Sequence, residues 1–305
     1  MPLVHEKGRT AMMHDRREWL KGLGFSLLVL AGWSALVGAA QAAKPDDGQT
    51  SATTRVFYTG HSFHMFVPAR IDQLVKLAGI TDYKLAGSQG IGGSKVIQHW
   101  DKPDGENRAK PALETGDVDV FTMAAHLLVP DPGIDNFAEL GLKHNPKLRL
   151  LVQGSWYPFD VASPEKRVKD NSTRDGAQIA DLQAAVDEWR TRLEAQADAL
   201  NKKYDRQAVF IVPVGDAVVK LRQMIVDGKF PGLSKQSELF RDPIGHGNGH
   251  VMALAAYCNY AAIFGRSPEG LKLNEPGVDD AQHAILQRIA WETVSGYSHS
   301  GVKAK

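Results

Sequence analysis

From about residue 55 to the C-terminus, short apolar runs alternate with longer stretches in which apolar residues recur at helical spacing. Each short run is followed within a few residues by Gly, Pro or polar residues, which predicts buried strands that end in loops. The predicted strands are residues 56–59, 83–86, 118–123, 148–153 and 208–212. The predicted helices are residues 69–78, 134–143, 178–201, 217–227, 250–264 and 280–295.

The longest predicted helix, residues 178–201, shows how the helices pack. Its apolar residues recur at spacings of three, four or seven and therefore share one face. They are Ile179, Leu182, Val186, Trp189, Leu193 and Leu200. This stripe favours a helix packed on a sheet over a coiled coil. Alternating strands and helices with right-handed crossovers then predict a three-layer α/β domain, residues 55–305, around a five-stranded, mainly parallel sheet.

Composition narrows the class of partner. The 305 residues include 36 Lys and Arg against 35 Asp and Glu, with no long basic run, which argues against nucleic acid as a partner. Small molecules or glycans are the expected partners, and the oligomeric state is left open. Cys258, the single cysteine, allows no internal disulfide and lies in an apolar helical stretch, where we expect it to be buried.

The first 42 residues have the features of an export signal. Arg16 and Arg17 precede an apolar run over residues 23–40, and Ala40-Gln41-Ala42 offers a small-x-small cleavage site. The paired arginines resemble a twin-arginine signal. Glycines and serines interrupt the apolar run, so cleavage is favoured over a retained membrane anchor. We expect a periplasmic or secreted protein with no stable membrane insertion, whose residues 43–54 form a linker.

In open α/β sheets the ligand binds beyond the carboxyl ends of the strands, so functional residues are expected in the segments that follow the predicted strands. Gly60-His61-Ser62 follows the first strand, where a serine on a sharp turn exposes its hydroxyl and its own amide. Helix capping is the alternative role for Ser62. A glycine-rich segment, residues 87–94, follows the second strand and predicts either an oxyanion-binding loop or a plain turn.

Two further segments carry histidines. His126 follows the third strand and is either a structural hydrogen-bonding group or part of a site. Near the C-terminus, Asp242, His246 and His250 lie in a glycine-rich segment just before an apolar helix. Asp242 and His246 are close enough to share a hydrogen bond across a turn, which would fix the tautomer of the imidazole.

The Gly-x-Ser motif after the first strand, the glycine segment after the second and the Asp/His pair before the last helices together resemble the SGNH/GDSL hydrolase superfamily. The resemblance implies a flavodoxin-like α/β/α fold and ester hydrolysis without a metal or other cofactor. It assigns Ser62 as nucleophile, His246 as general base and Asp242 as the residue that orients the base. It further implies that the amides of Ser62 and of Gly92 or Gly93 hold the oxyanion, and His126 falls where the family has an asparagine.

The chain departs from the family pattern in ways that leave alternatives open. Three residues separate Asp242 from His246, where the family commonly has two, so His250 is an alternative base. The altered asparagine block allows a non-catalytic, glycan-binding member of the same fold. The pairs His61/His64 and His246/His250 also permit a metal-dependent hydrolase.

The expected substrate is a small-molecule or carbohydrate ester. Residues 154–160 and 164–175 follow the fourth strand and are expected to form one wall of the cleft. His61, His64 and Trp156 are the predicted substrate-binding residues. The mixture of aromatic and polar residues favours an acylated carbohydrate over a long lipid chain.

Overall fold

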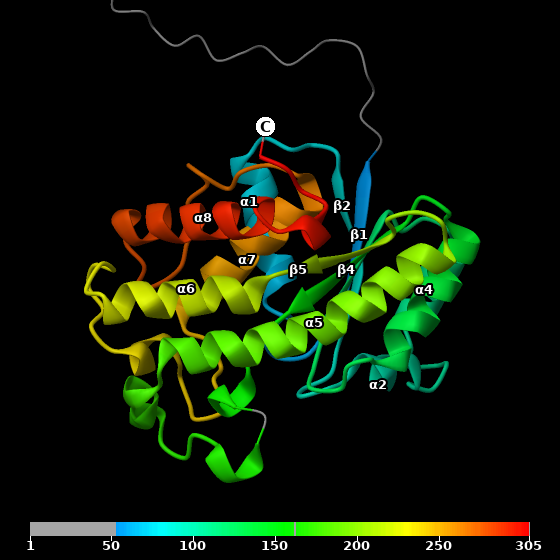
Figure 1. Ribbon diagram of the computed structural model, residues 1–305. Helices are drawn as coiled ribbons and strands as arrows, with labels where there is room; N and C mark the ends of the chain where they lie inside the picture. The colour runs from blue at the N-terminus through cyan, green and yellow to red at the C-terminus, as the bar shows by residue number, and fades with distance from the viewer. Residues whose placement is uncertain (1–52, 162, 305) are drawn as a thin grey trace, which may run out of the picture. The chain divides into compact units, whose positions relative to one another are not determined.

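All five predicted strands form, and every neighbouring pair is parallel. The computed structural model describes residues 53–161 and 163–304 (Figure 1). The strands are β1 (Thr54–Gly60), β2 (Tyr83–Gly90), β3 (Val120–Ala125), β4 (Arg149–Gly154) and β5 (Val209–Val212). They form one sheet in the order β2-β1-β3-β4-β5, which confirms the predicted α/β class. The predicted export signal, residues 1–42, and all but the end of the predicted linker lie outside the described residues.

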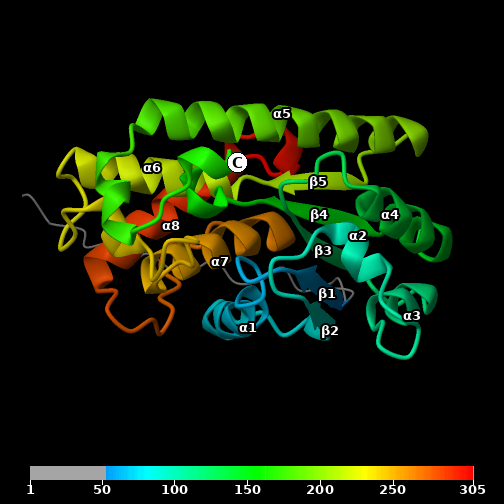
Figure 2. The ribbon, with the colours of Figure 1, turned by 90° about the horizontal axis from the view of Figure 1, so that it is seen from below.

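Helices cover both faces of the sheet. One apolar core joins β1, β4 and β5 to α1 (Val67–Leu77), α6 (Val214–Val226), α7 (Gly249–Phe264) and α8 (Asp280–Ser295). A second core lies on the opposite face beneath α2 (Val96–Trp100), α3 (Ala109–Glu114), α4 (Pro132–His144) and α5 (Ile179–Lys203). Figure 2 shows α1 and α7 on one side of the sheet and α2, α3 and α4 on the other. The three-layer arrangement is therefore as predicted. No helix in the described part of the chain is long and apolar enough to span a membrane.

Helix α5 follows the predicted stripe only in part. Trp189, Leu193 and Leu200 are buried in the core against the sheet, as expected. Leu182 and Val186 instead pack with Val219 of α6, in a separate small apolar cluster. The apolar spacing predicts the buried face of a helix but does not say which neighbour covers it.

The glycine-rich segment after β2 differs from the expected loop. Its first four residues, Gly87 to Gly90, continue β2 and pair with Phe57 to Gly60 of β1 after a register shift. Gly87 has φ +152°, and a Cβ there would lie 2.7 Å from the Phe57 ring. A position that sequence propensity favours as a turn is thus held in the sheet by the neighbouring strand.

Helix α7 is the central helix of its layer. It packs against α1, α6 and α8, and nearly all of its side chains are buried, including Cys258, as predicted. The Asn248 side chain caps its N-terminus by accepting hydrogen bonds from the amides of His250 and Val251. This cap fixes the point where the preceding segment, residues 240–248, meets the carboxyl ends of the strands.

Candidate active site

Ser62, His246 and Asp242 form a continuous hydrogen-bonded chain. His246 Nε2 lies 2.9 Å from Ser62 Oγ, and His246 Nδ1 lies 2.6 Å from Asp242 Oδ2. Because a carboxylate only accepts hydrogen bonds, Nδ1 carries the proton and the Nε2 lone pair faces the serine hydroxyl. The structure thus brings Ser62 into contact with His246, which lies 184 residues further along the chain.

The turn after β1 exposes Ser62. The amides of His64 and Met65 both donate to the carbonyl oxygen of His61, which closes a tight turn with the Ser62 side chain exposed at its tip. Ser62 does not cap α1, whose N-cap is Phe66. Gly60 permits the turn, because a Cβ there would lie 2.9–3.0 Å from His64 and Ala124. The geometry therefore favours the exposed-hydroxyl interpretation over the capping one.

Asp242 is held as an anion. Its Oδ1 accepts hydrogen bonds from the amides of Gly245, at 2.9 Å, and His246, at 3.2 Å. Burial acts to raise the pKa of Asp242, but these amides and the His246 ring outweigh it, so the pKa lies below its usual value. An ionised Asp242 can both orient His246 and balance the charge of an imidazolium.

His250 occupies a separate, structural place. It is buried, and its Nε2 lies 3.0 Å from Gln282 Oε1 while its Nδ1 lies 3.1 Å from Nδ2 of the Asn248 side chain. Of the two histidines considered as base, His246 is the one that contacts Ser62. No group of three or more His, Cys, Asp or Glu side chains suited to a metal occurs among residues 53–161 and 163–304.

The predicted role of His64 in substrate binding is wrong. His64 is fully buried, with Nδ1 2.9 Å from Gln153 Oε1 and Nε2 2.9 Å from Thr122 Oγ1. Burial lowers its pKa to about 4, so it is neutral and serves to join three strand ends. Both ring nitrogens of His64 are therefore bonded to side chains of β3 and β4, and neither is available to a substrate.

His61 does line the pocket beside Ser62. Its Nε2 lies 3.3 Å from the carbonyl oxygen of Ala125, and its Nδ1 accepts from the amide of Phe63 at 3.2 Å. Burial, together with the neighbouring His126 ring at 5.4 Å, lowers the pKa of His61 to about 3. His61 is therefore a neutral wall of the pocket whose polar atoms are already engaged.

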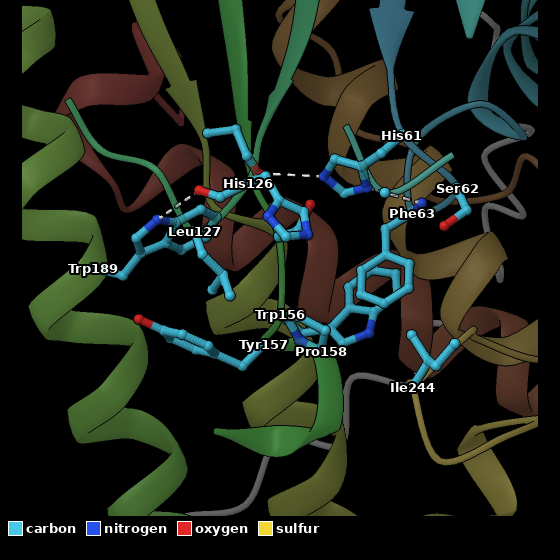
Figure 3. A pocket seen from close by; sticks show the side chains of 13 residues that line it. His61, Ser62, Phe63, His126, Leu127, Trp156, Tyr157, Pro158, Trp189 and Ile244 are labelled. Carbon is cyan, nitrogen blue, oxygen red and sulfur yellow. Dashed lines mark hydrogen bonds between the residues drawn. The ribbon is translucent and has the colours of Figure 1, made fainter. Parts of the chain in front are cut away.

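The pocket has a volume of about 50 Å³ and is partly open to solvent. Figure 3 shows the side chains that line it. Of the predicted oxyanion residues, Ser62, Gly93 and His126 line it, and Gly92 does not. Burial and the nearby Lys95 lower the pKa of His126, which favours a neutral ring. The lining residues are His61, Ser62, Phe63, Gly93, Ala125, His126, Leu127, Ser155, Trp156, Tyr157, Pro158, Trp189 and Ile244.

Trp156 lines the pocket but is packed as a structural residue. Its ring stacks on Phe63 with centroids 4.5 Å apart and planes 9° from parallel, and 4% of the residue is exposed. Its Nε1 donates to the carbonyl oxygen of Gly245 at 2.9 Å. Phe63 thus covers one face of the indole, and the bond to Gly245 joins this wall of the pocket to the segment that carries His246.

The predicted cleft wall divides into two parts with different roles. Residues 155–158 line the pocket, whereas residues 164–175 do not. Within the second part lies Arg174, whose side chain is fully buried. Its guanidinium pairs with Asp160, donates to the carbonyl oxygen of Pro243 at 2.5 Å and lies 4.5 Å from the centroid of the Phe240 ring. Arg174 therefore supports the segment that holds Asp242 and His246, a role that sequence analysis missed.

The contacts of Arg174 extend to neighbouring groups. Asp160 also accepts from Arg222 Nη2 at 2.8 Å, so one carboxylate faces two guanidinium groups. Asp160 has φ +63°, an uncommon conformation for a residue with a side chain. Gly245 has φ +102°, and a Cβ there would lie 3.2 Å from Arg174 Nη2. No pattern in the sequence marks these long-range contacts.

The sequence matches no protein-family model and no curated protein. Among solved structures, a DUF4886 family protein from Bacteroides uniformis is 15% identical with a TM-score of 0.52, covering 79% of this chain and 95% of its own. A candidate SGNH hydrolase from Slackia heliotrinireducens is 13% identical (TM-score 0.41; 68% of this chain and 97% of its own). A candidate GDSL-like lipase from Parabacteroides merdae is 12% identical (TM-score 0.43; 72% and 97%). The first of these likenesses shows a shared fold.

Proposed function

We propose that this protein is a serine-dependent ester hydrolase of the SGNH/GDSL type. The observation that carries the proposal is the hydrogen-bonded chain Ser62–His246–Asp242 at the edge of a pocket. An exposed serine, a base within 2.9 Å and an anion behind the base are the parts that nucleophilic acyl transfer requires.

The mechanism follows from the orientation of these groups. Ser62 Oγ attacks the ester carbonyl carbon while its proton passes to His246 Nε2, and Asp242 balances the imidazolium. The tetrahedral intermediate collapses as Nε2 gives the proton to the departing alcohol oxygen, leaving an acyl-serine. Water then attacks the acyl carbon, with Nε2 taking its proton and returning it to Ser62 Oγ.

The oxyanion requires donors on the pocket side of Ser62. The backbone amides of Ser62 and Gly93 and a ring N–H of neutral His126 are the groups we propose. A neutral imidazole can donate from the position where the family has an asparagine. Removal of one such donor typically lowers kcat by about 10²–10³-fold, so His126→Ala measures whether the ring takes this role.

A fluorophosphonate probe and a short aryl acetate test the proposal together. Wild-type protein and His250→Gln should label and turn over, whereas Ser62→Ala and His246→Ala should do neither. Circular dichroism of each variant checks that the fold is retained. Labelling of Ser62→Ala at the wild-type rate would refute Ser62 as nucleophile, and an inert wild type would favour the glycan-binding alternative.

Export is a separate proposal that depends on residues 1–42. We propose that the paired Arg16 and Arg17 direct the folded chain out of the cytoplasm and that the mature protein begins near residue 43. Replacing both arginines with lysine should retain the protein in the cytoplasm of its own host. Mass spectrometry of the exported form would give the cleavage site, and export of the double variant at the wild-type level would refute the twin-arginine assignment.

A further inference from the structure

The pocket beside Ser62 has chemically distinct ends. Ser62, Gly93 and His126 provide polar groups, whereas Leu127, Tyr157 and Trp189 provide apolar ones. Figure 3 shows Tyr157 and Trp189 on the far side of the His126 ring from Ser62. An apolar chain on the carbon atom that bonds to Ser62 would therefore extend past His126 towards Tyr157 and Trp189.

The residues absent from the lining show which half of an ester enters the pocket. His246 contacts Ser62 but does not line this pocket, and neither does Asp242. The base must reach the leaving oxygen, so the alcohol lies on the side of His246. The acyl chain then lies on the other side, in the pocket with the proposed oxyanion donors.

The walls of the pocket are fixed by buried contacts. Trp189 Nε1 donates to the carbonyl oxygen of His126 at 3.2 Å, and the Tyr157 ring packs 5.9 Å from the Trp189 ring. Trp189 and Tyr157 are 3% and 7% exposed, so neither can swing into solvent without opening the core. Their positions close that end of the pocket to further methylene groups.

The volume gives that limit. An apolar cavity of roughly 150 Å³ accepts benzene, with its six carbon atoms, so a pocket of about 50 Å³ holds about two carbon atoms. The carbonyl carbon itself lies at Ser62 Oγ and needs none of this space. Acetyl and propionyl groups therefore fit, butyryl is at the limit, and longer chains require the aromatic walls to move.

We propose that the site, acting as the ester hydrolase proposed above, selects esters of short acyl groups with two to four carbon atoms. The alcohol side is unconfined by this pocket and accepts bulky groups, sugars included. Leu127 is the half-buried aliphatic residue of the wall, and together with Tyr157 and Trp189 it sets the chain-length limit.

A series of p-nitrophenyl esters from acetate to octanoate tests this selection. Each methylene that fits should raise kcat/KM by up to about fourfold, so propionate should exceed acetate. Overpacking should then make hexanoate at least about tenfold poorer than propionate. Leu127→Ala should raise the hexanoate-to-propionate ratio by about tenfold. Leu77→Ala, the same change at a residue that is 52% exposed and outside the pocket, should leave the ratio unchanged.

The outcomes separate the inference from the proposed function. Equal turnover of octanoate and propionate by the wild type, or an unchanged ratio in Leu127→Ala, overturns the chain-length limit while ester hydrolysis stands. Acetates of a bulky alcohol, such as 4-methylumbelliferyl acetate and peracetylated glucose, should remain substrates. Their exclusion alongside acceptance of long acyl chains would place the alcohol in the pocket and overturn the assignment. Absence of both labelling and turnover with every ester overturns the proposed function and the inference together.

Discussion

Arg174→Ala removes the support beneath the segment that carries Asp242 and His246. Arg174 is fully buried and pairs with Asp160. It also donates to the carbonyl oxygen of Pro243 and, from Nε, to Asn171 Oδ1 at 2.9 Å. Its loss leaves Asp160 with Arg222 alone and takes a donor from the Pro243 carbonyl and from Asn171 Oδ1, in a space that water reaches poorly. We therefore expect both the stability of the fold and the geometry of the site to suffer.

The size of the effect follows from the partners that remain. Breaking a buried ion pair costs about 3–5 kcal/mol, and the lower end applies because Asp160 keeps Arg222. For a domain of this size, each kcal/mol lowers Tm by about 2–4 °C, so about 3 kcal/mol corresponds to roughly 6–12 °C. A displacement of His246 by about 1 Å would lower the rate of serine labelling about 100-fold.

Thermal unfolding and fluorophosphonate labelling measure the two effects. Arg288→Ala is the matched control, because Arg288 is an exposed residue of α8 that lines neither the pocket nor the segment of His246. That control should change stability by less than about 0.5 kcal/mol. Arg174→Lys keeps the charge but loses the planar fork, so it should recover stability better than labelling. A Tm within 2 °C of wild type and an unchanged labelling rate for Arg174→Ala would refute the reasoning.

Three further predictions address other features. Asp242→Asn should lower kcat/KM by about 10³-fold or more with little loss of Tm, and near-normal kinetics would contradict its role. The free energy of unfolding, measured by urea titration, should fall as the pH drops from about 6.5 to 4. Burial keeps His61 and His64 neutral in the folded protein, with pKa values of about 3 and 4, whereas the same histidines bind protons in the unfolded chain. The slope should be about 1 kcal/mol per pH unit for each histidine, and it should be smaller in His64→Gln. Gly133→Ala would place a Cβ 2.3 Å from the backbone nitrogen of Ile97 and should lower the free energy of unfolding by at least about 1–3 kcal/mol. Gly105→Ala, whose Cβ would have no atom within 4 Å, should leave stability nearly unchanged. Equal stabilities of the two variants would contradict the close packing of α2 on α4.

The strands and the three residues of the hydrogen-bonded chain could be predicted because their signals are local. Each strand is a short apolar run with a loop signal after it, and parallel strands bring their carboxyl ends to one edge. Asp242 and His246 are four residues apart, so a single turn places them in contact. Only the pairing of Ser62 with His246 spans the chain, and the fold class supplied it.

The remaining features depend on contacts that no local pattern records. Helices α2 and α3 have five and six residues, too few to show a helical period. His64 follows an exposed serine yet is buried, because Thr122 and Gln153 bond its ring. Arg174 lies in a polar stretch that composition marks as a surface loop, and its burial arises from Asp160 and from backbone carbonyl groups of another segment.

The segment after β4 ties the wall of the pocket to the segment that carries His246. Residues 155–158 line the pocket, Trp156 Nε1 and the Phe159 amide bond to the carbonyl oxygens of Gly245 and Ile244, and Arg174 supports Pro243. In many α/β enzymes a specificity loop can diverge or be exchanged without disturbing the chemistry beneath it. Here a graft that replaced residues 155–174 would also remove three supports of the His246 segment. New specificity on this scaffold would therefore have to arise by point substitutions in the pocket, or by replacing both segments as a matched pair.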